Sequence, residues 1–196
     1  MARQTGKCFC SKCGQTHDVQ YYASVDAQAN PELKEKLLSG ELFTWTCPHC
    51  GTLNLASYPF LYHDPQNQLM LVLTQASMNA EGLPEGYHGR IVRSVGELIE
   101  KIKIFDAGLD DVAVEMCKFI TVKELGKNVE LKFLKLDGAD MEITFTYPEN
   151  GNMEMLVTGL NVYEDCAGIL SRNPQITQSL RGLVTVNAEW LRNFFE

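Results

Sequence analysis

Two matching motifs dominate the sequence, CSKCG at residues 10–14 and CPHCG at residues 47–51. In each motif, two intervening residues allow a tight turn to direct both sulfurs at one ion. The glycine that follows, Gly14 or Gly51, can take the backbone conformation in which N–H groups point back at the thiolates. The motifs therefore predict one closed tetrahedral zinc site, whose four ligands are Cys10, Cys13, Cys47 and Cys50.

The segment between Cys13 and Cys47 is 33 residues long, which exceeds the usual gap of a zinc ribbon. A doubling of loop length costs only about 0.6 kcal/mol, whereas binding of structural zinc contributes roughly 10–16 kcal/mol. The long segment is therefore compatible with the site. A redox CxxC would be a single motif leading a helix in a βαβ unit, and here two motifs lie among predicted strands. Because four thiolates leave no open coordination position, the zinc is expected to be structural.

Three other cysteines and one histidine fall outside this ligand set. Cys8 could replace Cys10 as a ligand, but its spacing does not suit a metal-binding turn, so we expect it to be half-exposed or packed. His49 lies between two ligands and is expected to point away from the ion. Cys117 and Cys166 fall on predicted helix faces, where they are expected to be small core residues. An odd total of seven cysteines, without a secretion signal, favours reduced thiols.

The first part of the chain is expected to form a zinc-ribbon-like β lobe, residues 1–82. Its alternating and apolar stretches predict strands at residues 17–27, 41–47, 51–60 and 67–75. A short helix is expected after Asn30 and Pro31, with Gly40 at its end. The segment 78–89 is rich in glycine, proline and polar residues, and it is the predicted junction to a second lobe, residues 89–196.

The second lobe is expected to combine helices with an antiparallel three-stranded meander, so the fold class is α+β. Ser94 and Glu97 form a capping box before a first helix, and a second helix follows it. Three β segments at 128–136, 140–148 and 152–160 are separated by Asp137-Gly138 and Asn150-Gly151, which suit tight hairpin turns. Helices capped by Asn161 and Asn187 are expected to cover one face of this sheet.

The composition of the chain argues against several classes of protein: membrane-spanning, secreted and nucleic-acid-binding. The 196 residues are 45% hydrophobic, enough for a sizeable core, and carry a formal charge of −8 with a pI near 5.0. No apolar run approaches the roughly 20 residues that cross a bilayer, and the N-terminus lacks the apolar core of a signal peptide, so the cytoplasm is the expected compartment. Four zinc-bound thiolates would move the formal charge to about −10, and this negative charge disfavours binding of nucleic acid.

Two other clusters of polar residues have side chains of the kinds found in functional sites. The stretch YPFLYHD, residues 58–64, gathers tyrosines with His63 and Asp64, but no nucleophile or open metal accompanies them, and a packed strand end followed by a turn is the favoured interpretation. His88 is expected to be a surface histidine in a loop. The acids at positions 106, 110 and 111 lack the spacing of a calcium loop and are explained by helix capping.

The cysteine frame and its surroundings resemble the bacterial and archaeal CpXC family. The resemblance is carried by the two motifs, by PELK at 31–34, GELF at 40–43 and YPFLYHD at 58–64, and it covers roughly residues 7–125. Ser11 stands where the family name implies proline, which should alter only the rigidity of the turn. The resemblance implies a zinc-ribbon-like domain with a bound metal, and it implies no activity.

The favoured hypothesis is a zinc-binding protein that acts as a protein-interaction or scaffold module, because the metal site is closed and no catalytic constellation is visible. One alternative is a nucleic-acid-associated zinc ribbon, for which Arg3, Lys7, Lys12 and His17 could form a small basic patch. The other is an enzyme whose site is assembled from residues distant in sequence. The partner is expected to be another protein.

Overall fold

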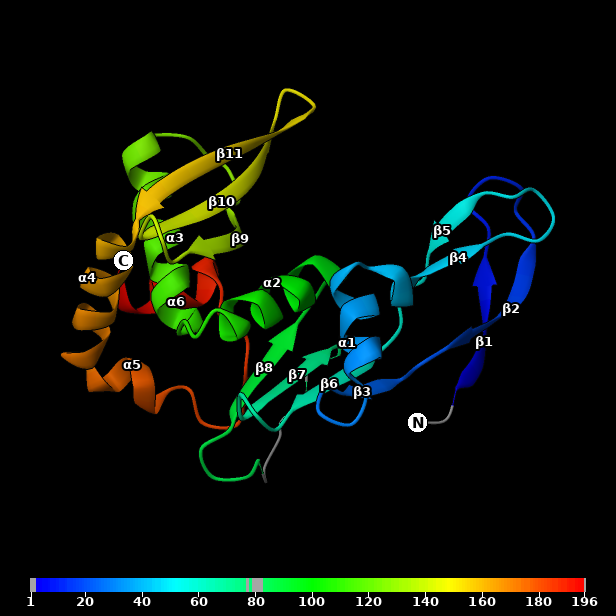
Figure 1. The fold of residues 1–196 in the computed structure, drawn as a ribbon, viewed down its shortest axis with the longest axis horizontal. Coiled ribbons are helices and arrows are strands. Elements are labelled where there is room, and N and C mark those ends of the chain that lie inside the picture. Colours follow the sequence, from blue (N-terminus) through cyan, green and yellow to red (C-terminus); the bar gives the residue numbers. More distant parts are fainter. Residues whose placement is uncertain (1–2, 77, 79–82, 196) are drawn as a thin grey trace. The chain divides into compact units, whose positions relative to one another are not determined.

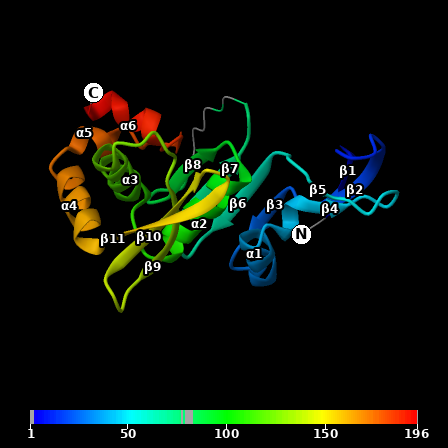
Figure 2. The same ribbon diagram turned by 90° about the horizontal axis from the view of Figure 1, so that it is seen from above.

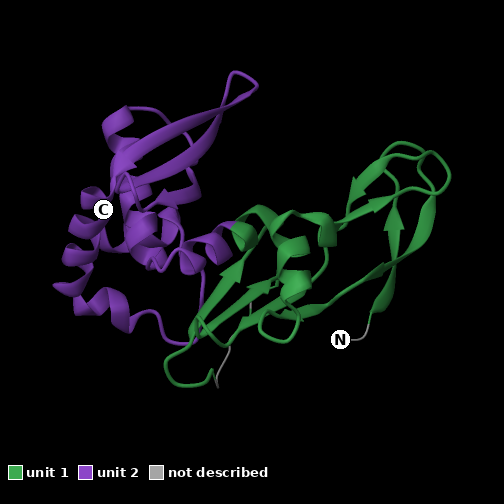
Figure 3. Cartoon of the chain, viewed as in Figure 1, with its two compact units in different colours: residues 1–99 green, residues 100–196 purple. Residues whose placement is uncertain are grey.

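The computed structural model describes residues 3–76, 78 and 83–195 of a mixed α+β protein (Figure 1). The chain forms two compact units, residues 1–99 and 100–196 (Figure 3). The division falls inside helix α2 (Val95–Asp106). The expected lobe limits, 1–82 and 89–196, stay a prediction, and part of the expected junction lies outside the described residues. Among the described residues, no helix has the length and apolarity that a membrane span requires.

Two short antiparallel hairpins in unit 1 carry the cysteine motifs. Strands β1 (Gln4–Phe9) and β2 (Thr16–Tyr21) flank the first motif, and β4 (Thr44–Thr46) and β5 (Leu53–Leu55) flank the second. Each motif is therefore the connection of a two-stranded sheet. The first part of the expected strand 41–47 is a 3₁₀ turn, η1 (Glu41–Phe43), so only its second half pairs.

A second sheet in unit 1 contains β3 (Ser24–Asp26), β6 (Phe60–Asp64), β7 (Leu69–Leu73) and β8 (His88–Val92) in the order β3-β6-β7-β8. The pairs β3–β6 and β7–β8 are parallel, and β6–β7 is antiparallel. The single strand expected at 17–27 is wrong, because its two halves, β2 and β3, belong to different sheets. The apolar alternation continues through the break, so the pattern alone did not indicate the change of partner.

Helix α1 (Pro31–Leu38) begins and ends as its sequence predicts. Pro31 occupies the first turn, Leu33 and Leu37 are buried, and Gly40 has the left-handed φ of 79°. The side chain of Asn30 makes no capping bond to the helix, because its Nδ2 donates to the carbonyl of Asp26 instead.

Helices α2 and α3 (Asp111–Leu125) have the expected N-terminal caps. The Ser94 hydroxyl accepts the N–H of Glu97, whose carboxylate accepts the N–H of Arg93. Asp110 caps α3 by accepting two backbone N–H groups of its first turn, at 2.8 and 3.0 Å. Gly126 ends α3 in the left-handed conformation.

Unit 2 contains one antiparallel sheet of three consecutive strands, β9 (Lys132–Asp137), β10 (Glu142–Glu149) and β11 (Asn152–Gly159), with β10 in the middle. Asn150 and Gly151 both have positive φ, 51° and 81°, and form the expected two-residue turn. The turn expected at Asp137-Gly138 is longer than predicted, because the Asp137 carboxylate accepts two N–H groups of the connection and Met141 takes the positive φ instead.

The helices of the C-terminal part are α4 (Leu160–Ser171), α5 (Pro174–Gln178) and α6 (Ala188–Phe195), with a short strand β12 (Leu183–Val184) before α6. Helices α4 and α6 both contact α3 (Figure 2). Asn187 caps α6 by accepting the N–H of Trp190. The cap expected at Asn161 is wrong, because α4 already begins at Leu160, after Gly159. Helix α5 was not expected.

The core of unit 2 is formed by the inner face of the sheet and by α3, α4 and α6. Its fully buried members include Val114, Phe145 and Leu191. Cys117 and Cys166 are buried in the same core, which confirms their interpretation as small core residues.

Beside this core, Glu100 is a buried carboxylate with several partners. Its Oε1 accepts the ammonium of Lys118 at 3.1 Å and the N–H of Phe133 at 2.7 Å, and Lys132 lies 3.5 Å from Oε2. Lys118 also donates to Glu115 at 2.8 Å. Burial works to raise the pKa of Glu100, but Lys118, Lys132, the N–H of Phe133 and Lys101 together outweigh it and lower that pKa.

Candidate metal centre

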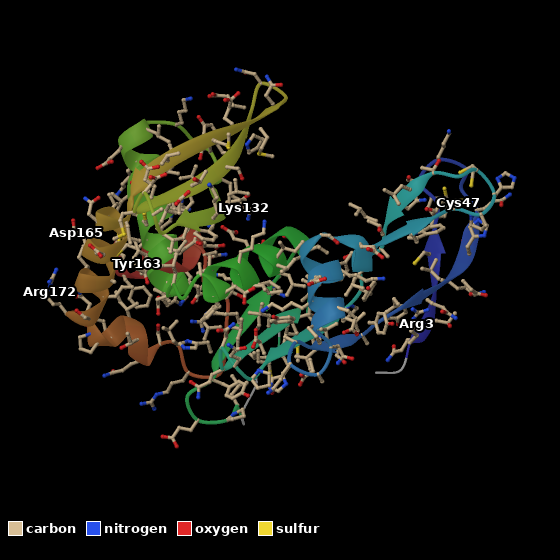
Figure 4. The ribbon with its side chains drawn as sticks, in the orientation of Figure 1. Arg3, Cys47, Lys132, Tyr163, Asp165 and Arg172 are labelled. Atoms are coloured by element: carbon tan, nitrogen blue, oxygen red, sulfur yellow. The ribbon has the colours of Figure 1, made fainter. Side chains whose placement is uncertain are left out.

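The four motif cysteines converge on one point. Their Sγ atoms all lie within 4.8 Å of one another, and the pairs Cys10–Cys50 and Cys13–Cys47 are each 3.6 Å apart. Figure 4 labels one of the four, Cys47, at the end of strand β4. Tetrahedral coordination with zinc–sulfur bonds of about 2.3 Å requires sulfurs about 3.8 Å apart. The sulfurs therefore already have the spacing that one zinc ion needs, and the chain from 14 to 46 spans the two halves of the site.

The two motifs have the same backbone geometry. The N–H of Cys10 donates to the carbonyl of Gln15, and the N–H of Gly14 donates to the carbonyl of Cys10; both bonds recur at the same offsets from Cys47. Gly14 and Gly51 have φ values of 72° and 69°, a conformation that costs other residues roughly 1 kcal/mol or more. This repeat explains why glycine follows both motifs, as the sequence predicted.

Three residues that sequence reasoning did not assign to the centre contact its sulfurs. Nε2 of His17 lies 3.4 Å from the sulfur of Cys47, and the Thr52 hydroxyl lies 3.3 Å from that of Cys50. Asn54 donates its Nδ2 to the sulfur of Cys10 at 3.6 Å. Hydrogen bonds of this kind stabilise thiolates and orient them toward a metal.

Asn54 also links the two motifs. It is buried on β5, its Nδ2 donates to the carbonyl of Thr52 at 2.8 Å, and its Oδ1 accepts both the N–H and the hydroxyl of Ser11, each at 2.9 Å. The expectation that Ser11 differs from proline only in turn rigidity is therefore wrong. Proline has no N–H to donate, so serine at this position adds two bonds between the motifs.

Cys8 and His49 stand where the sequence placed them, outside the group of four. The Cys8 side chain is half-buried on β1 and packs against the cluster around the motifs, and its register partner is His17. His49 is exposed. Within the described part of the chain, the close group of possible metal ligands is formed by the four motif cysteines.

The thiols influence one another strongly. The N–H of Cys13, against the effect of burial, lowers the pKa of the Cys10 thiol to about 6. The hydroxyl and the N–H of Thr52 lower the pKa of Cys50. At Cys13, the N–H of Gln15 favours the thiolate, but burial and the three neighbouring sulfurs outweigh it and raise the pKa to about 12. Four thiols this close cannot all ionise without a cation between them, so metal binding would release protons.

In the stretch 58–64, the side chains of residues 60–64 alternate between the two faces of β6. Nδ1 of His63 is hydrogen-bonded to the carboxylate of Asp26 at 2.9 Å, and Nε2 is hydrogen-bonded to the hydroxyl of Tyr87 at 3.1 Å. Asp64 accepts hydrogen bonds from the ammonium of Lys34 and from the hydroxyl of Tyr62. The interpretation of this stretch as a packed strand is thus confirmed.

The remaining polar candidates have structural partners. His88 is half-buried at the start of β8 rather than in a loop, and its N–H donates to the carbonyl of Gln68. Asp110 is the cap of α3, and Asp111 forms a buried ion pair with Lys101 at 2.6 Å. Asp110 and Asp111 therefore both have structural partners.

Comparison with known proteins gives one result that bears on the centre. A family model described as CpXC protein matches residues 8–118, more than half of the 196 residues, and the match includes both cysteine motifs. Neither the search of curated proteins nor that of solved structures finds a match.

Proposed function

The chain belongs to the CpXC family, and from this and the convergence of its paired cysteines we propose that it is a zinc-binding protein. Cys10, Cys13, Cys47 and Cys50 would hold the ion in a zinc-ribbon-like lobe. The observation that carries the proposal is the spacing of the four sulfurs, which lie within 4.8 Å of one another on two hairpins.

The chemistry of the ligand set favours a structural zinc ion. Thiolates are soft ligands that select zinc over magnesium or calcium. Bound by four of them, zinc has no open position and supplies folding energy rather than Lewis-acid chemistry. The hairpins need such a link, because each has only two strands and a two-stranded sheet is marginally stable by itself.

Metal analysis of the purified protein tests the proposal. We expect one zinc per chain, and Ser in place of any of the four motif cysteines should abolish stoichiometric binding. Cys8→Ser is the matched control, because it changes a neighbouring thiol on the same hairpin and should retain the metal. Full zinc content in Cys10→Ser or Cys47→Ser, or loss of zinc in Cys8→Ser, would contradict the assignment.

We propose further that the lobe works as a protein-interaction or scaffold module. The hairpins expose apolar side chains, Phe9 on β1 and Leu53 and Leu55 on β5, and the Leu55 side chain is 81% exposed. Leu53 and Leu55 lie on the same exposed face of β5, and exposed apolar side chains that gather on one face are typical of a surface that binds another protein. The formal charge of −8 argues against a polyanion as the partner.

Cross-linking in native cells, followed by mass spectrometry, tests the interaction role. The double change Leu53→Lys, Leu55→Lys should remove the cross-linked partner while zinc content stays at one per chain. Gln28→Lys adds a charge at another exposed position of unit 1 and serves as the control. Partners that persist in the double variant would contradict this surface. Salt-dependent binding to random DNA or RNA would favour a nucleic-acid role instead.

A further inference from the structure

The two edges of the sheet in unit 2 differ in how they are protected. The β9 edge carries Lys132 and Lys135, and its pairing with β10 shifts register between Thr144 and Phe145. Lysines and bulges are two of the devices that prevent an edge strand from pairing with another chain. The β11 edge has neither: its eight residues contain no lysine, arginine or proline, and they pair with β10 without a shift.

The hydrogen-bonding groups on the free side of β11 belong to its odd-numbered residues. In the two-residue turn at Asn150-Gly151, the carbonyl of Glu149 faces the N–H of Asn152 across the hairpin. Because bonding direction alternates along an antiparallel strand, the even-numbered residues of β11 bond to β10. The N–H and C=O groups of Met153, Met155 and Val157 therefore point away from the sheet, and among the described strands β11 pairs with β10 alone.

The same three residues form an exposed apolar stripe. Their side chains lie on one face of the strand, with exposed fractions of 66% for Met153, 70% for Met155 and 53% for Val157. Figure 1 shows β11 on the outer side of the sheet, with β10 between it and β9. Unpaired backbone groups and uncharged apolar side chains thus coincide along one edge.

We propose that this edge pairs with a second copy of the chain, as an antiparallel β11–β11 contact that joins the two sheets into one six-stranded sheet. The two-fold axis would pass beside Met155, which then lies opposite the partner's Met155. Met153 lies opposite the partner's Val157, so the apolar stripe is complementary to itself, as a two-fold interface requires. Three residues on each side contribute outward groups, giving about six new backbone hydrogen bonds.

The charges of the strand select this register. With Met155 at the centre, Glu154 lies opposite the partner's Leu156, and no like charges face each other. A shift that brings Met153 opposite the partner's Met155 would place the two copies of Glu154 directly opposite, which is destabilising. A second copy fits better than an unrelated acidic or basic peptide, because the stripe carries no charge for such a peptide to recognise, and an uncharged seam avoids like-charge juxtaposition between two chains of net charge −8.

The test uses the full-length, zinc-loaded protein and measures its mass by sedimentation over a roughly thousand-fold range of concentration. Wild type should shift from monomer to dimer. Met155→Lys and Met155→Glu each place like charges opposite across the axis and should raise the dimer dissociation constant roughly tenfold or more. A mixture of the two variants should dimerise again, because a lysine then faces a glutamate. Rescue by mixing is specific to a contact in which residue 155 meets itself.

Two controls separate this contact from other associations. Leu61→Lys introduces the same charge at an exposed apolar position of unit 1 and should leave the dimer unchanged. Hydrogen exchange of peptide 152–159 should slow as concentration rises, whereas exchange of the opposite edge, peptide 132–137, should not change. A protein that stays monomeric at every concentration overturns the proposal, as does a dimer that persists in Met155→Lys. Neither result bears on the metal site, whose test is the zinc content.

Discussion

Asn54→Ala provides the sharpest test of how the centre is supported. Asn54 is not a proposed ligand, yet it donates to the sulfur of Cys10 and accepts two hydrogen bonds from Ser11. Truncation to alanine leaves all four thiols in place and removes this support. Asn54→Asp keeps the shape and the acceptor oxygen, but it cannot donate to the sulfur and it adds a negative charge beside the thiolates.

The size of the effect follows from the bonds that are lost. A hydrogen bond to a charged group contributes about 1.5–3 kcal/mol. Loss of a residue that orients a metal ligand commonly lowers metal affinity 10–100-fold, which corresponds to about 1.4–2.7 kcal/mol. The two estimates agree. Loss of the two hydrogen bonds from Ser11 adds little to this free-energy cost, because Ser11 is exposed and water can replace the amide oxygen of Asn54 as the acceptor.

The measurement is competition for zinc against a chromophoric chelator at fixed pH and ionic strength. We expect affinity to fall 10–100-fold in Asn54→Ala and at least as far in Asn54→Asp. Thr46→Ala is the control, because Thr46 is an exposed residue on the neighbouring strand β4. Affinities of both Asn54 variants within about twofold of wild type would refute the reasoning that this residue couples the two motifs to the ion.

Three further predictions concern the metal, a buried charge and the helix caps. Removal of zinc by a chelator should change the fluorescence of Trp45, because Trp45 packs among the motif cysteines. The measurement uses a Trp190→Phe background, in which Trp45 is the remaining tryptophan. An unchanged emission spectrum would contradict the proposed metal site. Glu100→Gln should destabilise the protein by about 3 kcal/mol at pH 7. Because the pKa of Glu100 is lowered on folding, its contribution is present above the ordinary value of about 4.5 and is lost as pH falls through the folded-state pKa, so denaturation curves of variant and wild type should converge in acid. Asn187→Ala should cost about 1 kcal/mol in chemical denaturation, whereas Asn161→Ala should cost far less because Asn161 caps no helix.

The cysteine ligand candidates could be predicted because all the information lies within two five-residue motifs. The spacing and the trailing glycines are local, and local geometry is what a short motif specifies. His17 and Asn54 could not be found this way. Each contacts a sulfur of the other hairpin, His17 that of Cys47 and Asn54 that of Cys10, so the contact depends on how the two hairpins pack together, and this packing has no signature in a single sequence.

The same distinction separates the turns that were predicted from those that were not. Asn150-Gly151 forms the expected turn because its backbone preference and the flanking strands agree. At Asp137-Gly138 the aspartate side chain competes with the tight turn by accepting N–H groups farther along, and the connection lengthens. Helix α5 begins at Pro174 after Asn173, a signal as good as that of α1, but its single apolar contact residue, Ile176, gave no helical period to detect.

The proposed zinc ion would also stabilise structure outside the two hairpins, because the long segment between the motifs contains other elements of the fold. Strand β3 and helix α1 both lie within residues 14–46, and β3 pairs in parallel with β6, which follows the second motif. An ion bound to both motifs closes a loop that contains β3 and so reduces the number of conformations from which the parallel pairing must form. Parallel strands distant in sequence are slow to pair, and β3 contributes only three residues. The structural metal would therefore stabilise a sheet that contributes no ligand to it.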